Sequence, residues 1–186
     1  MKHDITIVLI GMKSSGKTTT GKALAKVLEV RFIDMDSELE QEHCAVKKEQ
    51  LPFREIFKKY GCDYFRELET STLTKLHGTL KDKKYVLATG GGLPLEESNQ
   101  TLLKNMGTIV FLDISSDSLL PRIISGGIPP FFSYPDNPEK SLKELLATRS
   151  PMYKQVADIT LKCNSESPNI LVEKIVERLE GEASAT

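Results

Sequence analysis

The stretch Gly11-Met12-Lys13-Ser14-Ser15-Gly16-Lys17-Thr18 decides the fold, because it matches the phosphate-binding pattern G-x-x-x-x-G-K-[ST] in the context that this pattern requires. Residues 4–10 form a short β-branched apolar run typical of a buried strand, and residues 19–28 combine helix formers with apolar residues at helical spacing. The alternative is a chance glycine turn before a helix, and ordinary residue frequencies give a chance match to the four fixed positions on the order of 1% in a chain of this length. The sequence therefore predicts a nucleotide site.

The chemistry of phosphate binding assigns roles within this loop. Its backbone N–H groups would point at the phosphates, and the following helix N-terminus would add a partial positive charge. Lys17 would reach the β- and γ-phosphates, and the Thr18 hydroxyl would ligate Mg²⁺. We expect ATP to contact Gly11, Lys13, Ser14, Ser15, Gly16, Lys17, Thr18 and Thr19.

The composition favours a single soluble domain that acts on a small molecule. A length of 186 residues suits one domain with a small inserted subdomain. The 25 basic and 26 acidic residues nearly cancel, so no electrostatic surface for nucleic acid or for an acidic membrane is expected. We expect a monomer.

The cysteines and the N-terminus indicate a cytoplasmic protein. Cys44, Cys62 and Cys163 are odd in number and widely spaced, without a C-x-x-C pair or a histidine cluster, which argues against disulfides and against a zinc site. The N-terminus shows no signal peptide, and the apolar runs are too short to cross a bilayer.

Strand-like runs alternate with helical patterns along the chain, which predicts an α/β fold with helices on both faces of a parallel sheet. The runs are residues 4–10, 30–33, 85–89, 108–112 and 158–161. Ligands of such sheets bind beyond the carboxyl ends of the strands. The segments directly after the first three runs are the phosphate loop, Asp34-Met35-Asp36 and Gly90-Gly91-Gly92, so we expect the site there.

Two longer stretches interrupt this alternation. Residues 37–84 are strongly helical in pattern and predict an inserted acceptor-binding subdomain. Residues 126–138, with four prolines, two glycines and three aromatic residues, predict a mobile lid within about 120–140. Residues 1–186 would thus form one kinase domain with these two additions, and residues 181–186 would be a frayed tail.

Asp34 and Asp36 are candidates for phosphoryl-transfer chemistry. Residues two apart on an extended segment project to the same side, so both carboxylates could face the phosphate loop. Asp34 would hold Mg²⁺, and Asp36 would orient or deprotonate the attacking hydroxyl. The structural alternative is that Asp36 only caps a helix beginning near Ser37, with Asp34 in a polar turn.

The glycine triplet and two arginines indicate a function only in combination with the other motifs of the chain. Gly90, Gly91 and Gly92 would let the backbone approach a substrate closely, unless they form a plain turn. Arg66 lies three residues before Glu69 on a predicted helix, where the carboxylate could hold the guanidinium. Either Arg66 or Arg149 alone would be interpreted as surface charge.

Taken together, these segments resemble the shikimate kinases, a family of the nucleoside monophosphate kinase group, over nearly the whole chain. The motifs appear in the family's order as Gly16-Lys17-Thr18, Asp34-x-Asp36, Glu55-Ile56-Phe57, Gly61, Phe65-Arg66-x-x-Glu69, Gly90-Gly91-Gly92, Arg149-x-Pro151-x-Tyr153, and Asn164 with Pro168. The resemblance implies a three-layer α/β/α fold with five parallel strands in the order 2-3-1-4-5.

The resemblance also implies an activity, the transfer of the ATP γ-phosphate to the 3-hydroxyl of shikimate. Asp36 would contact the substrate hydroxyls, and Gly90, Gly91 and Gly92 would line the acceptor pocket. Arg66 and Arg149 would bind the substrate carboxylate, for which a bidentate guanidinium is well suited. The loop from Asn164 to Pro168 would lie against the adenine.

The lid departs from the family's pattern, R-x-x-R-D-K-x-R-P-L-L. Arg122 is retained at the first position and would contact ATP, but Ser125 and Pro129 stand where two further arginines would fall. Since an arginine at the transferring phosphate supplies a factor of roughly 10³ to 10⁵, we expect a substitute cation, with Lys13 as the candidate. About six extra residues lie near positions 45–50.

Three functional hypotheses remain at this point. The chain is a shikimate kinase with an unusual lid, a kinase of a related small hydroxy acid, or a catalytically weak relative that binds nucleotide or hydroxy acid. Retention of Lys17, Thr18, Asp34 and Asp36 argues against the third hypothesis.

Overall fold

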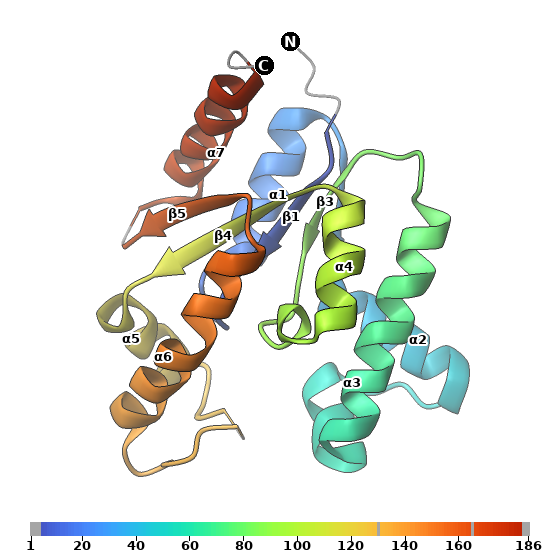
Figure 1. Cartoon of the computed structure of the whole chain (residues 1–186). Helices are drawn as coiled ribbons and strands as arrows, with labels where there is room; N and C mark the ends of the chain where they lie inside the picture. Colours follow the sequence, from blue (N-terminus) through green and yellow to red (C-terminus); the bar gives the residue numbers. More distant parts are fainter. Residues whose placement is uncertain (1–4, 130, 165, 184–186) are drawn as a thin grey trace.

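Five parallel strands form the sheet at the centre of the structure, in the order β2-β3-β1-β4-β5 (Figure 1). The structure is a computed structural model that describes residues 5–129, 131–164 and 166–183. Position 130 of the expected lid and positions 184–186 of the expected tail lie outside the described residues. The strands are β1 (Ile7–Ile10), β2 (Arg31–Asp34), β3 (Tyr85–Ala88), β4 (Thr108–Ile114) and β5 (Ile159–Cys163). The predicted fold class and strand order are confirmed.

Helices cover both faces of the sheet. The helices are α1 (Lys17–Leu28), α2 (Met35–Lys47), α3 (Phe53–Thr79), the short 3₁₀ helix η1 (Leu93–Leu95), α4 (Glu97–Met106), α5 (Ser116–Ser125), α6 (Pro138–Val156) and α7 (Pro168–Ala183). α1 and α7 pack together on one face, and α4 and α6 lie on the other (Figure 1). Within the described residues, no helix combines the length and the apolar character that a bilayer span requires.

β1 is the central strand, and all four of its residues are fully buried. It is hydrogen-bonded to β3 on one side and to β4 on the other, with Ile7 in register with Val86 and Thr108. A strand with neighbours on both edges and helices on both faces must be apolar throughout, which explains the continuous apolar run. The phosphate loop therefore leaves the sheet at its most rigid point.

α2 and α3 form a helical layer beyond the carboxyl ends of the strands (Figure 1). α3 is broken at Gly61, where φ is 82° and ψ is 178°. Since a left-handed φ is easily adopted only by glycine, Gly61 permits this kink. The break divides α3 into residues 53–60, near α2, and a longer second part that carries Arg66.

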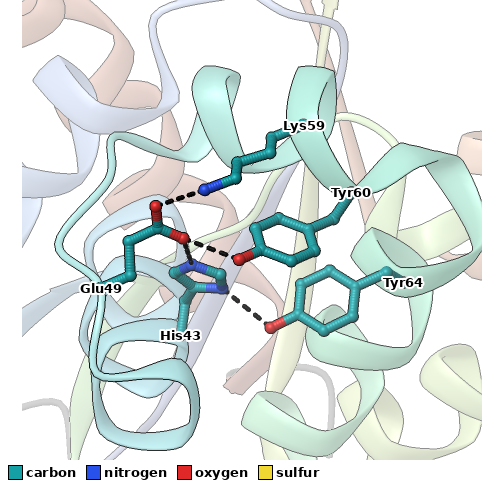
Figure 2. A network of polar contacts seen from close by, with 5 residues as sticks. All are labelled: His43, Glu49, Lys59, Tyr60 and Tyr64. Atoms are coloured by element: carbon teal, nitrogen blue, oxygen red, sulfur yellow. Dashed lines mark hydrogen bonds and ion pairs between the residues drawn. The ribbon is translucent and has the colours of Figure 1, made fainter.

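Glu49, within the segment 45–50 where the resemblance implies an insertion, anchors the first part of α3. Glu49 accepts a hydrogen bond from Lys59 Nζ at 2.5 Å and from the Tyr60 hydroxyl at 2.7 Å (Figure 2). His43 is fully buried and lies between Glu49 and Tyr64. Its Nδ1 is 2.8 Å from the Tyr64 hydroxyl, and its Nε2 is 3.7 Å from the Glu49 carboxylate. The segment thus ties the end of α2 to both sides of the kink in α3.

Residues 126–137 connect α5 to α6 at the position expected for the lid. Gly127 has a φ of 83°, which glycine alone adopts without strain, and the side chain of Phe132 is buried. Asn137 caps α6, since its side chain accepts a hydrogen bond from the Lys140 N–H. The segment therefore has a glycine in the left-handed region near its start and ends at a capped helix start.

Candidate active site

A cavity of about 640 Å³ lies where β1, β2 and β3 end. It brings together most of the residues predicted from the sequence. These are Lys13, Ser14, Gly16, Lys17, Thr18, Thr19, Asp34, Asp36, Arg66, Gly90, Gly91, Gly92, Arg122 and Arg149. The rule that ligands bind beyond the carboxyl ends of parallel strands accounts for this convergence.

A second hollow of about 210 Å³ adjoins the first, since Gly16, Thr19 and Arg122 line both. Ser15 and Asn164 line this second hollow. Gly11 lines neither cavity, because it lies beneath the loop. A Cβ at this position would stand 2.9 Å from the Leu112 carbonyl oxygen, which explains why a glycine begins the loop.

Lys17 is buried beneath the phosphate loop. Its Nζ donates hydrogen bonds to the carbonyl oxygens of Gly11 at 3.0 Å and Met12 at 2.7 Å. Burial lowers the pKa of Lys17 to about 8, although the carboxylates of Asp36 and Asp34 act in the opposite direction. The ammonium group is thus held by its own loop at the start of α1.

The two aspartates occupy different elements, which corrects the sequence prediction. Asp34 ends β2, and its carboxylate caps α2 by accepting a hydrogen bond from the Asp36 N–H at 3.1 Å. Asp36 lies in the first turn of α2. The expectation of one extended segment was wrong, and so was the alternative in which Asp36 is the cap, because the helix begins at Met35. Both carboxylates nevertheless line the cavity.

Asp36 is mostly enclosed. Burial raises the pKa of Asp36 to about 6, and the nearby Asp34 carboxylate acts in the same direction, whereas Lys17 opposes them. A carboxyl group with a pKa near neutrality can both accept and release a proton at physiological pH.

Thr18 and Asp34 fit a magnesium ion. The Thr18 hydroxyl donates a hydrogen bond of 2.9 Å to Asp34 Oδ2, so a hydroxyl and a carboxylate oxygen lie side by side at the cavity. Oxygen ligands of this kind suit Mg²⁺, which takes its remaining ligands from water and substrate phosphates. Within the described residues no cluster of three or more acidic, histidine or cysteine side chains could hold a metal by itself.

Arg66 is held against the glycine triplet. Its guanidinium forms an ion pair with Glu69, as expected from their spacing. Glu69 is only 2% exposed, and this burial raises its pKa to about 7, although Arg66 lowers it. A Cβ at Gly92 would collide with the guanidinium, and one at Gly90 would stand 3.2 Å from Glu69 Oε1. The triplet therefore leaves room for this ion pair.

Arg149 reaches the cavity from α6. Its guanidinium carbon lies 5.3 Å from the centre of the Phe131 ring, within the range of a cation–π contact. Arg66 and Arg149 line the same cavity.

Sequence reasoning missed Arg54 and the aromatic wall of the cavity. Arg54 follows the first residue of α3 and lines the cavity with Phe53, Phe57, Phe65 and Phe131. The recurrence of phenylalanine four residues apart, at Phe53 and Phe57, is a signal that could have indicated one helix face. No comparable signal points to Arg54.

A parallel sheet with a phosphate loop after its central strand, and a cavity that joins this loop to a carboxylate and two arginines, defines an ATP-dependent kinase of small molecules. Comparison with known proteins gives the family. The model of the family "Shikimate kinase" matches residues 13–180. The chain therefore belongs to the shikimate kinase family.

Individual relatives agree with this assignment. A shikimate kinase of Bordetella avium (strain 197N) is 36% identical over 97% of this chain and 81% of its own length, and one of Pseudomonas aeruginosa (strain LESB58) is 34% identical over 94% and 96%. Among solved structures, shikimate kinase from Acinetobacter baumannii in complex with shikimate is 33% identical, with a TM-score of 0.85 over 97% of this chain and 96% of that chain.

Proposed function

We propose that this protein transfers the γ-phosphoryl group of ATP to the 3-hydroxyl of shikimate. The observation that carries the proposal is the shared cavity of Lys17, Asp36 and the two arginines Arg66 and Arg149. This set offers a phosphate site, a proton acceptor and a carboxylate site within one enclosure. Its agreement with the family assignment supports shikimate as the acceptor.

The acceptor would be held by its carboxylate. Arg66 and Arg149 would donate hydrogen bonds to it, with Glu69 fixing the guanidinium of Arg66. Asp36 would accept the proton of the attacking hydroxyl. The hydroxyl oxygen would form the new bond to the γ-phosphorus while the bond from the γ-phosphorus to the bridging oxygen breaks, and ADP would leave.

The nucleotide would lie along the phosphate loop. Lys17 would direct an N–H toward the phosphates, and the adenine would extend toward Arg122 and Asn164 in the adjoining hollow. Thr18 and Asp34 would hold Mg²⁺, which when bound neutralises charge on the phosphate oxygens. Since one chain supplies the whole lining, we also propose that the enzyme acts as a monomer.

An ADP-release assay with shikimate, quinate, dehydroshikimate and gluconate as acceptors tests the proposal. We expect kcat/KM for shikimate to exceed that for the other compounds by at least about tenfold. The reason is that the acceptor must present its carboxylate to the arginines and its hydroxyl to Asp36 at the same time. Preference for another hydroxy acid would favour the related kinase, and ATP binding without turnover of any compound would favour a binding protein.

The carboxylate site is tested by Arg149→Ala. Loss of a charge-assisted hydrogen bond costs roughly 1.5–3 kcal/mol, so the KM for shikimate should rise about 10- to 100-fold. The KM for ATP should stay within about threefold, and Arg178→Ala, a change of an exposed arginine on α7, should alter neither value. Equal effects of Arg149→Ala on both substrates would contradict the assignment.

A further inference from the structure

Among the described residues, six basic side chains line the cavity, and one of them has no role in the site as described so far. The six are Lys13, Lys17, Arg54, Arg66, Arg122 and Arg149. Phosphoryl transfer requires positive charge at the oxygens of the migrating group. The question is therefore which of these cations is free to reach it.

Four of the six cations have contacts that assign them to other parts of the site. Lys17 donates to carbonyl oxygens of its own loop, and Arg66 is paired with a buried carboxylate. Arg122 donates to the Asn164 carbonyl oxygen at 3.1 Å, on the side of the second hollow. Arg149 lies over an aromatic ring at the acceptor side. Lys13 and Arg54 remain.

The connection between α5 and α6 adds no cation of its own. Residues 126–139 contain neither lysine nor arginine. The next basic residue, Lys140, lies with its Nζ 3.9 Å from the centre of the Tyr134 ring and is absent from the described lining of the cavity. The positive charge opposite the phosphate loop must therefore come from another element.

Arg54 lines the cavity from α3. It lies in the first turn of α3, and its Nη1 donates a hydrogen bond of 3.3 Å to the Gly126 carbonyl oxygen, at the start of the segment that should close the cavity. Its guanidinium carbon lies 5.8 Å from the centre of the Phe53 ring, and within the described part of the chain no carboxylate lies within ion-pair distance of Arg54. A guanidinium has five N–H donors, so most of its hydrogen-bonding capacity is unused.

The charge of Arg54 acts on both sides of the reaction centre. Burial lowers the pKa of Lys13 in the phosphate loop, and the positive charge of Arg54 lowers it further. The same charge acts to lower the pKa of Asp36, against the dominant effect of burial. Arg54 therefore lies within electrostatic reach of the phosphate loop and of the group that would accept the proton.

We propose that Arg54 is a catalytic residue that donates hydrogen bonds to the non-bridging oxygens of the γ-phosphoryl group during its transfer. This inference rests on the proposed function. As the acceptor oxygen bonds to phosphorus and the bond to the ADP oxygen breaks, the hydroxyl proton passes to Asp36 and Arg54 keeps its own protons. The arginine thus supplies charge from the acceptor subdomain rather than from residues 126–137.

The contacts of Glu49 hold in place the helical segment that carries Arg54. Lys59 and Tyr60, which bind Glu49, belong to the same uninterrupted helical segment as Arg54, ahead of the break at Gly61 (Figure 2). A cation on a held helix loses little freedom when it meets a phosphate. The extra residues near 45–50 would thereby contribute to catalysis without touching the substrate.

Steady-state kinetics of Arg54→Ala, Arg54→Lys, Lys13→Ala and the control Arg178→Ala test the proposal. We expect Arg54→Ala to lower kcat about 100- to 1,000-fold with both KM values within about threefold, and Arg54→Lys to recover only part of this loss. Arg178→Ala should match the parent. A loss in Arg54→Ala below about threefold, or a larger loss in Lys13→Ala than in Arg54→Ala, would overturn the assignment.

A binding measurement separates this inference from the choice of acceptor. ADP with Mg²⁺ and aluminium fluoride mimics the migrating phosphoryl group, so Arg54→Ala should weaken its binding at least about tenfold while leaving ADP with Mg²⁺ alone within about twofold. This comparison needs no turnover and holds even if shikimate is not the acceptor. Equal weakening of both ligands would contradict a role at the γ-phosphoryl group.

Discussion

The hydroxyl of Tyr153 donates a hydrogen bond of 2.5 Å to the carbonyl oxygen of Gly91 and lies 3.7 Å from the sulfur of Met12. One buried side chain of α6 thereby contacts both the glycine triplet and the phosphate loop. Its ring packs against Phe111 of β4, with ring centres 5.1 Å apart. The two loops that line the cavity therefore share a support in the core.

Tyr153→Phe should loosen this support. The change removes the hydroxyl that donates to the Gly91 carbonyl oxygen, at a cost of about 1–2 kcal/mol of unfolding free energy. We expect a lower thermal midpoint and a higher KM for the acceptor. Tyr134→Phe, which removes the hydroxyl of an exposed ring, is the matched control and should leave both unchanged. An unaltered acceptor KM in Tyr153→Phe would show that the triplet holds its shape without this bond.

Gly92→Ala should displace Arg66 while the fold survives. The new methyl group would overlap the guanidinium, which is the movable end of a flexible side chain. We expect the acceptor KM to rise about tenfold and the thermal midpoint to stay within a few degrees. Gly78→Ala adds a methyl group in open space on α3 and serves as the control. Kinetic constants of Gly92→Ala that match those of Gly78→Ala would refute the link between Gly92 and Arg66.

Glu69 should make stability depend on pH. Its pKa is about 7 in the folded protein against 4.5 as the ordinary value, so between these pH values the folded state binds more protons than the unfolded state. Unfolding free energy should therefore fall as pH rises from 4.5 to 7, by on the order of 1–3 kcal/mol from this group. Denaturant titrations at several pH values should show that Glu69→Gln lacks this part of the slope. Parallel curves for the two proteins would contradict the raised pKa.

Asp36→Asn should abolish turnover while ATP binding is retained, because the amide can no longer accept the proton of the hydroxyl. In the parent, kcat/KM should decline as pH falls through about 6, where Asp36 becomes protonated. Asp34→Asn is the companion variant, and there we expect a weaker dependence on Mg²⁺ with residual turnover. Measured turnover of Asp36→Asn within tenfold of the parent would remove Asp36 from the mechanism.

Much of this architecture could be predicted from the sequence because strand ends and functional residues coincide. The apolar runs before the phosphate loop, before Asp34 and before Gly90 each marked a strand of the sheet, and the strand order followed from the resemblance to the family. The observed strand boundaries differ from the predicted ones by a few residues. The first strand begins at Ile7, where pairing with both neighbours starts, whereas the expected run began at position 4, which lies outside the described residues.

Other features depend on local geometry that spacing does not encode. Whether Asp34 or Asp36 caps α2 depends on the residue at which the backbone turns from strand to helix. Arg54 and Arg66 are twelve residues apart within α3, and straight helical spacing would not place both at one cavity. The kink at Gly61 changes the direction of the chain between them, and a single glycine within a helical pattern does not reveal the angle.

The break at Gly61 also separates α3 into two helical units that line different parts of the cavity. Residues beyond it hold Arg66 and Glu69 against the core, whereas residues 53–60 form the other wall of the cavity. Because no helical turn continues through a residue with extended ψ, a change in the first unit need not rotate the second. Mutant libraries confined to Phe53 and Phe57, with Arg54 kept unchanged, should therefore vary the shape of the accepted molecule while its carboxylate stays bound, which makes these two positions the natural starting point for directed evolution toward new hydroxy acids.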